Sequence, residues 1–198
     1  MNKPDLRQIL LSALAKRGDS SSDFDLNPGI RLPAGRTPRQ AAVLVAFNES
    51  DGSLILTKRS AHLKHHPGQI AFPGGRRDDT DADLEATALR EAHEEIGLVP
   101  SNVEVLGCLP THETVSNYIA TPVVALVKEP FVFEPEAGEV EEAFTVPFDH
   151  VTNPSNFRVE GRRWQGQKRF YFTVPYGPYY IWGATALILR RFAERLDQ

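Results

Sequence analysis

The chain has 198 residues with a formal net charge of −4, and 41% of its residues are hydrophobic. This length fits one domain with a buried core, and the acidic balance argues against nucleic acid as a partner, because nucleic-acid binding usually needs a basic excess. No segment approaches the roughly 20 apolar residues of a membrane-spanning helix, so we expect no membrane partner either. The single cysteine, Cys108, cannot form an internal disulfide, which favours a reducing compartment and predicts a cytoplasmic protein.

The first part of the chain predicts a short helix followed by strands. Residues 1–17 have the spacing of an amphipathic helix, and residues 18–25 have the composition of a linker. We therefore expect residues 1–36 to form an N-terminal helix and linker, and residues 37–198 to form the main domain. Two antiparallel strands are predicted at 41–47 and 53–57, with a turn at Asp51–Gly52 between them.

The rest of the chain predicts more strands and two more helices. Residues 67–75 end in Pro73-Gly74-Gly75 and must form a loop or strand end with unusual backbone angles. Asp81 can cap a helix over 82–96, which Gly97 would end. Strands are expected at 103–109, 121–127 and 143–147, a hairpin at 157–174 and an amphipathic helix at 180–196. This order predicts an α/β fold of the α+β kind, with a mixed central sheet covered on both faces.

The charges are unevenly distributed around the predicted central helix. Between Gly52 and Arg77 there is no acidic residue, whereas the segment from Asp78 to Glu95 has eight acidic residues and one basic residue, Arg90. Adjacent basic and acidic stretches suit a magnesium-bound polyphosphate, because acids hold the cation and bases hold the phosphates. A solvated surface with compensating ion pairs would explain the charges alone equally well.

Three glutamates in this helix form a candidate metal site. Glu91, Glu94 and Glu95 are three and four residues apart, so a helix would carry their carboxylates on one side. Like charges at this spacing destabilise a helix, and Mg²⁺, which prefers oxygen ligands, would relieve the repulsion. Taken alone, such a cluster is more often a solvated helix face.

The sequence around these glutamates resembles a known family motif. Residues 90–98 (REAHEEIGL), preceded by residues 72–75 (FPGG), resemble the Nudix box and match its second half at every fixed position. The first half departs, because the usual upstream glutamate would fall on Ala82; a spacer longer by one residue would align Gly75 and Asp81 instead. The resemblance implies a Nudix-type α/β/α sandwich that cleaves a diphosphate linkage with Mg²⁺ or Mn²⁺. It also implies that Glu91, Glu94 and Glu95 hold the metal and take part in catalysis, with Arg90 bracing a carboxylate.

A second resemblance concerns the substrate. Residues 56–60 (LTKRS), Lys64, the pair 68–69 and residues 181–186 (IWGATA) resemble the coenzyme A diphosphatases of this family. The resemblance implies hydrolysis of coenzyme A, or a derivative, to 4′-phosphopantetheine and adenosine 3′,5′-bisphosphate. The expected substrate-binding residues are Lys58, Arg59, Lys64, Arg76, Gly74 and Gly75.

Several alternatives stay open. The same cations would serve ADP-ribose, a dinucleotide or a nucleoside triphosphate nearly as well, and a non-catalytic nucleotide-binding module would keep the same fold. Glu139 is a candidate second catalytic acid, since Nudix relatives often add an acid from a loop, but it is equally well explained as a surface turn residue. A homodimer is among the assemblies we consider.

Overall fold

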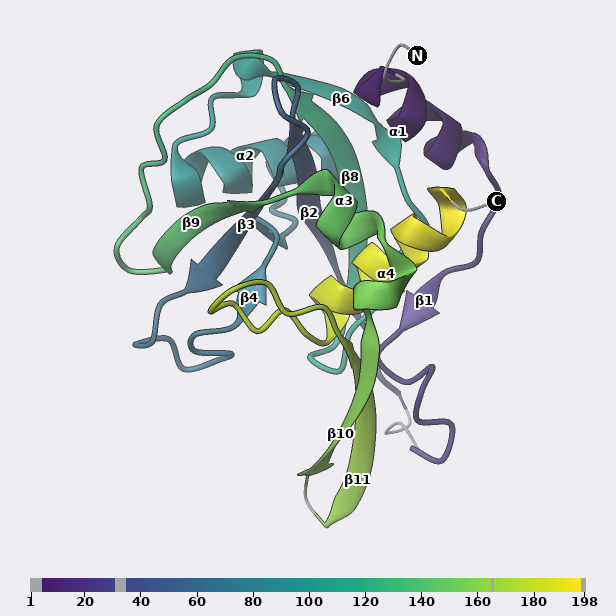
Figure 1. The fold of residues 1–198 in the computed structure, drawn as a ribbon. Helices are drawn as coiled ribbons and strands as arrows, with labels where there is room; N and C mark the ends of the chain where they lie inside the picture. The colour runs from purple at the N-terminus through teal and green to yellow at the C-terminus, as the bar shows by residue number, and fades with distance from the viewer. Residues whose placement is uncertain (1–4, 31–34, 165, 197–198) are drawn as a thin grey trace.

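The computed structural model describes residues 5–30, 35–164 and 166–196. Its main element is a mixed nine-stranded sheet, and a separate two-stranded hairpin projects from the body (Figure 1). In the part of the chain that the structure describes, no helix is long and apolar enough to cross a membrane.

The centre of the sheet is the pair β2 (Arg39–Asn48) and β8 (Tyr118–Val127), which run parallel from Arg39↔Tyr118 to Asn48↔Val127. On the β2 side, β3 (Leu54–Arg59) and β5 (Gly74–Arg76) are antiparallel to β2, and β4 (Ile70–Ala71) and β9 (Val140–Val146) are antiparallel to β3. On the β8 side, β6 (Val103–Cys108) and β7 (His112–Glu113) are antiparallel to β8, and β1 (Ser21–Ser22) is parallel to β7. The sheet is therefore mixed, as predicted.

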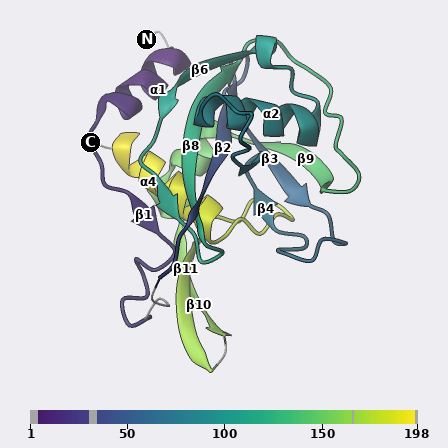
Figure 2. The same ribbon diagram turned by 180° about the vertical axis from the view of Figure 1, so that it is seen from behind.

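Helices cover both faces of the sheet. Alternate residues of β2 point to opposite faces, so Leu44 packs with Ala92 of α2 (Leu84–Ile96) whereas Phe47 packs with Phe192 of α4 (Ala184–Leu196). Figure 2 shows α2 alone across one face. The other face carries α4 with α1 (Leu6–Ala15) and α3 (Phe148–Thr152), and Leu10 of α1 is fully buried in that core. The expected α/β/α sandwich is confirmed.

The remaining described elements are short. The 3₁₀ turns η1 (Pro100–Asn102) and η2 (Pro154–Asn156) precede β6 and β10 (Arg158–Trp164), respectively. β10 pairs antiparallel with β11 (Gln167–Thr173) to form the projecting hairpin, which was predicted from the sequence.

Three boundary predictions were wrong. The cap of α2 is Asp83, whose side chain accepts a hydrogen bond from the Ala86 N–H at 2.8 Å, so the helix begins at Leu84 and Asp81 is not its cap. The last helix begins at Ala184 and not near residue 180, because Gly183 has a φ of 66° and Trp182 forms a β-bridge to Thr173. The linker at 18–25 contains β1, which is added to the edge of the sheet.

Candidate active site

A buried carboxylate lies where α2 meets β5. Glu95 is 4% exposed, and its Oε2 accepts a hydrogen bond from the Gly74 N–H at 3.1 Å. Burial raises the pKa of Glu95 to about 8, and the nearby Glu91 and Glu139 carboxylates add to this, while the Gly74 N–H and Arg59 oppose it. The Glu95 carboxyl is therefore mostly protonated, and so uncharged, near pH 7 in the metal-free protein.

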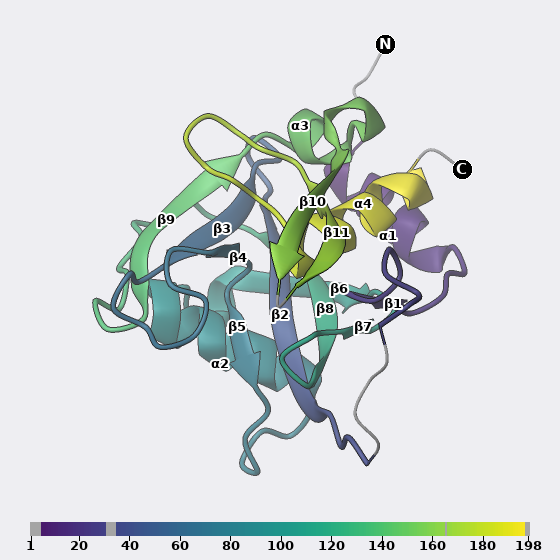
Figure 3. The ribbon, with the colours of Figure 1, turned by 90° about the horizontal axis from the view of Figure 1, so that it is seen from below.

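Glycines let the chain pass close to these acids. Gly74 has a φ of 155° and pairs with Val43 of β2, so the Pro73-Gly74-Gly75 segment is a strand end with unusual backbone angles, as expected. A Cβ on Gly75 would lie 2.5 Å from Cδ of Glu91, so only glycine leaves room for that carboxylate. Burial raises the pKa of Glu91 too, with further contributions from Glu94 and Glu139 and an opposing one from Arg90. Figure 3 shows β5 beside α2, where these contacts are made.

Arg90 connects the acids of α2 to the preceding loop. Its Nε and Nη2 donate to the two oxygens of Asp81 at 3.0 Å each, and its Nη1 donates to Glu91 at 3.0 Å and to Glu94 at 2.9 Å. The Asp81 side chain is only 5% exposed, and Arg90, the Asp78 N–H and the Thr87 hydroxyl hold the pKa of Asp81 well below its usual range. Asp81 is thus the buried partner of Arg90. This agrees with the alignment in which a spacer longer by one residue puts Asp81 at the acidic position of the motif.

A loop acid is held near the same site by backbone hydrogen bonds. The Glu136 N–H donates to the Glu95 carbonyl at 3.0 Å, and the Ser60 N–H donates to the Glu139 carbonyl at 2.8 Å. These bonds fix the segment 136–139 between the C-terminal half of α2 and the end of β3. Glu139 is exposed, but it is close enough to raise the pKa of both Glu91 and Glu95.

The predicted substrate-binding residues are only partly brought together. Arg59, Gly74 and Gly75 lie beside the acids, as described above. Lys58 donates to Glu141 at 2.6 Å, which raises the pKa of Lys58, and Arg76 is exposed with its side chain 3.4 Å from Asp78. Lys64 is exposed in the loop between β3 and β4.

The acids have the chemistry of a divalent-cation site, but their side chains do not yet have its geometry. Glu139 raises the pKa of both Glu91 and Glu95, and Glu91 raises that of Glu95, as neighbouring acids without a shared cation do; hard cations prefer such oxygen ligands. Within residues 5–30, 35–164 and 166–196, however, no three acidic, histidine or cysteine side chains are grouped closely enough to hold a metal ion as they stand. The side chain of Glu94 is 58% exposed and accepts a hydrogen bond from Nη1 of Arg90, as that of Glu91 does.

Comparison with known proteins identifies the family. A family model described as NUDIX domain matches residues 37–170, so the chain belongs to the Nudix family. It is 40% identical over 182 residues to "Uncharacterized Nudix hydrolase NudL" of Pectobacterium atrosepticum, an alignment that covers 89% of this chain and 94% of that protein. The protein of the same description from Escherichia coli (strain SMS-3-5 / SECEC) is 40% identical over 159 residues, covering 80% and 83%. The chain is accordingly a Nudix hydrolase, an enzyme of the diphosphatase type, and these descriptions leave its substrate open.

Solved structures support the fold. The MutT protein from Methanosarcina mazei Go1 aligns with a TM-score of 0.53 at 18% identity, covering 83% of this chain and 96% of that one. The NUDIX domain of Shewanella oneidensis NrtR, solved with ADP ribose, aligns with a TM-score of 0.51 at 18% identity, covering 85% and 95%. At this identity the likeness shows the fold alone.

Proposed function

We propose that this Nudix hydrolase cleaves the diphosphate bond of coenzyme A or a derivative, releasing 4′-phosphopantetheine and adenosine 3′,5′-bisphosphate. The observation that carries the diphosphatase chemistry is the buried Glu95 carboxyl, held by the Gly74 N–H beside Glu91, Glu139 and the cationic Arg59. The preference for coenzyme A is inferred from the resemblance of residues 56–69 and 181–186 to that group of Nudix enzymes.

In this proposal the acids of α2 form the metal site. Glu91, Glu94 and Glu95 would hold Mg²⁺ or Mn²⁺. The bound cation would supply Lewis-acid polarisation of a phosphoryl oxygen and favour in-line attack by water. Arg90, anchored by Asp81, keeps Glu91 and Glu94 within hydrogen-bonding reach of one guanidinium and so limits where their carboxylates can move.

Proton transfer and substrate binding fall to other groups. Glu139 is our candidate for the base that accepts the proton of the attacking water, because it is exposed and near Glu95. Arg59 lies beside the acids and would contact the diphosphate, with Lys64 and Arg76 as exposed cations for the outer phosphates. Lys58 would join them only by leaving Glu141.

The test of the substrate is a side-by-side comparison of kcat/KM for coenzyme A, ADP-ribose, a dinucleotide and a nucleoside triphosphate with saturating Mg²⁺ or Mn²⁺. We expect coenzyme A to be preferred by at least about tenfold, and a preference for another compound would replace coenzyme A as substrate while leaving the diphosphatase chemistry intact. The second candidate is ADP-ribose or a related nucleotide, because the exposed cations Lys64 and Arg76 would serve its phosphates nearly as well.

The test of the site is the replacement of Glu95 by glutamine, which keeps the shape of the side chain and removes its charge. We expect kcat to fall by about 10² or more, as for loss of a group that stabilises developing charge, with folding retained. Glu85→Gln is the matched control, because Glu85 is exposed in the first turn of the same helix. An active Glu95→Gln enzyme would remove this residue from the proposed mechanism.

A further inference from the structure

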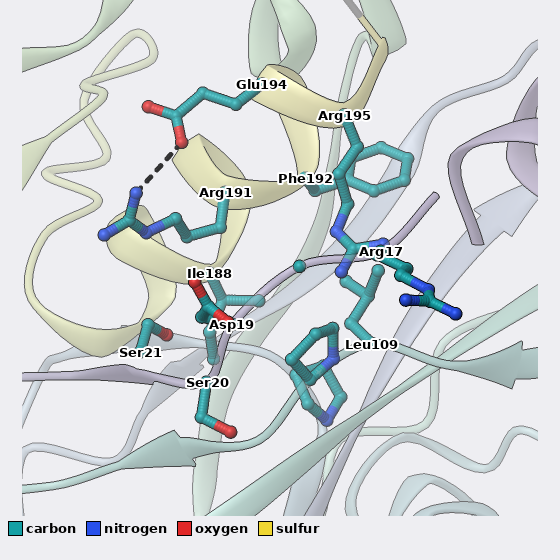
Figure 4. Close-up of a pocket in the computed structure, with 13 residues that line it drawn as sticks. Arg17, Asp19, Ser20, Ser21, Leu109, Ile188, Arg191, Phe192, Glu194 and Arg195 are labelled. Carbon is teal, nitrogen blue, oxygen red and sulfur yellow. Dashed lines mark hydrogen bonds and ion pairs between the residues drawn. The ribbon is translucent and has the colours of Figure 1, made fainter. Parts of the chain in front are cut away.

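A cavity lies on the opposite face of the sheet from the acids of α2. It has a volume of about 190 Å³ and is bounded by the segment Arg17–Ser21 after α1 and by the last turns of α4 (Figure 4). Its apolar wall includes Leu109 and Phe192. The lining combines residues from the two ends of the described chain, and all of those residues except Leu109, Pro110 and Pro122 lie outside the segment 37–170 that matches the family model.

A buried guanidinium faces this cavity. Arg195 is 7% exposed, and its Nη1 donates to the Ala13 carbonyl at 3.1 Å and also to the Lys16 carbonyl. Among the residues that the structure describes, no carboxylate lies within ion-pair distance of Arg195, and burial lowers its pKa. A buried cation that is held only by carbonyl dipoles is costly, because its charge is not neutralised.

The chain passes closely over this guanidinium. A Cβ on Gly18 would lie 3.0 Å from Cζ of Arg195, and closer still to its Nη2. Gly18 therefore packs directly against the Nη2 side of Arg195, and a larger residue at position 18 would push the guanidinium aside. Arg195 and Arg17 are both among the residues that line the cavity (Figure 4).

The other charges of the lining leave an excess of positive charge. Glu194 is engaged by the Nε of Arg190 at 2.9 Å and by the Nη1 of Arg191 at 3.2 Å, so its carboxylate is already neutralised. Arg17 and Asp19 are both exposed at the rim. Arg191 is also paired with Asp25 at 3.4 Å. Among the described residues of the lining, the two arginines Arg17 and Arg195 therefore remain outside any ion pair, against the single such acid Asp19.

Hydroxyl donors are available in the same wall. Ser20 Oγ lies 2.9 Å from Thr111 Oγ1, and when Thr111 donates in this pair the Ser20 hydrogen is free to point to a ligand. The cavity is smaller than the roughly 300–1,000 Å³ of pockets that take drug-sized ligands, so its size suits one small ion and not a whole nucleotide.

We propose that this cavity binds a small tetrahedral oxyanion of the phosphate type, held by Arg17, Arg195 and the Ser20 hydroxyl. Such an anion would neutralise the buried guanidinium through charge-assisted hydrogen bonds. It would also tie the segment after α1 to α4, so its binding stabilises the packing of the N-terminal helix on the body. The source is inorganic phosphate or the phosphate group of a small organic molecule, and the site is independent of the substrate proposed above.

The test is a titration of the full chain in metal-free buffer, followed by the backbone amide resonances of Gly18, Ser20 and Ser21. Inorganic phosphate should shift these amides with a Kd on the order of 1 mM. At ten times that Kd the Tm should rise by about 3–6 °C relative to chloride at equal ionic strength. Glycerol 3-phosphate, a small phosphate ester, is titrated separately: shifts of the same amides by either compound support the site, and the compound that binds more strongly identifies the source.

The rim variant Arg17→Gln leaves Arg195 and its carbonyl contacts in place, so it should stay folded. It should weaken phosphate binding by at least about tenfold, because a lost charge-assisted bond is worth about 1.5–3 kcal/mol. Arg7→Gln is the control on α1, the helix that precedes Arg17, since Arg7 pairs with Glu104 and does not line the cavity. Amides at 18–21 that do not respond to either compound, or an unchanged Kd in the rim variant, would overturn the proposal.

Discussion

Replacing Glu95 by glutamine should flatten the pH dependence of folding stability in the metal-free protein. The carboxyl has an ordinary pKa of 4.5 and a folded-state pKa of about 8, so between these values the folded chain binds a proton that the unfolded chain has lost. Its contribution to stability is therefore fully present below pH 4.5 and is lost as the pH rises through about 8. At about 1.4 kcal/mol for each pKa unit, this amounts to about 5 kcal/mol.

The assay is urea unfolding between pH 5 and pH 9 in the presence of a chelator. The free energy of unfolding of the unmodified protein should fall by about 3–5 kcal/mol across this range, and Glu95→Gln should remove most of that fall. Glu85→Gln, on the exposed side of the same helix, should keep it. If the free energy of unfolding depended on pH in the same way in the unmodified protein and in Glu95→Gln, burial of this carboxyl would not be the source of the pH dependence.

Three further outcomes follow from the contacts of the site. Asp81→Asn breaks a buried ion pair and should lower the free energy of unfolding in urea by about 2–4 kcal/mol, whereas Asp78→Asn, at a more exposed carboxylate, should change it by less than about 1 kcal/mol. Gly75→Ala should lower kcat/KM by at least about tenfold by displacing a glutamate of α2, and Gly29→Ala, where a Cβ meets nothing within 4 Å, should leave kcat/KM unchanged; equal rates for the two would contradict this. Arg59→Gln should raise the KM for the diphosphate substrate by about tenfold or more in steady-state assays, and an unchanged KM would remove it from the substrate site.

Elements with local signals were predicted well from the sequence. The turn at Asp51–Gly52 and the end of α2 at Gly97 were both found, because each needs a residue that tolerates positive φ, and the two glycines have φ values of 75° and 73°. The apolar run of β2 and the apolar face of α4 were also recognised from the sequence, and both are buried in the structure.

The features that could not be predicted from the sequence depend on contacts between distant segments. β4 and β5 are two and three residues long and exist only because β3 and β2 pair with them, so no local periodicity marks them. A carboxylate near a helix start can cap the helix or bind an arginine. Only the fold shows that Asp81 binds Arg90. The same holds for Glu139, whose nearness to Glu95 depends on backbone bonds between its loop and α2.

The central claim is that the acids between α2 and β5 capture a divalent cation that is needed to break a diphosphate bond. The most direct measurement is incubation of the full chain with coenzyme A and Mg²⁺ or Mn²⁺, with and without excess chelator, followed by mass analysis of the products. We predict 4′-phosphopantetheine and adenosine 3′,5′-bisphosphate in equal amounts, and neither product once the metal is chelated. Continued formation of both products after exhaustive chelation would contradict the account.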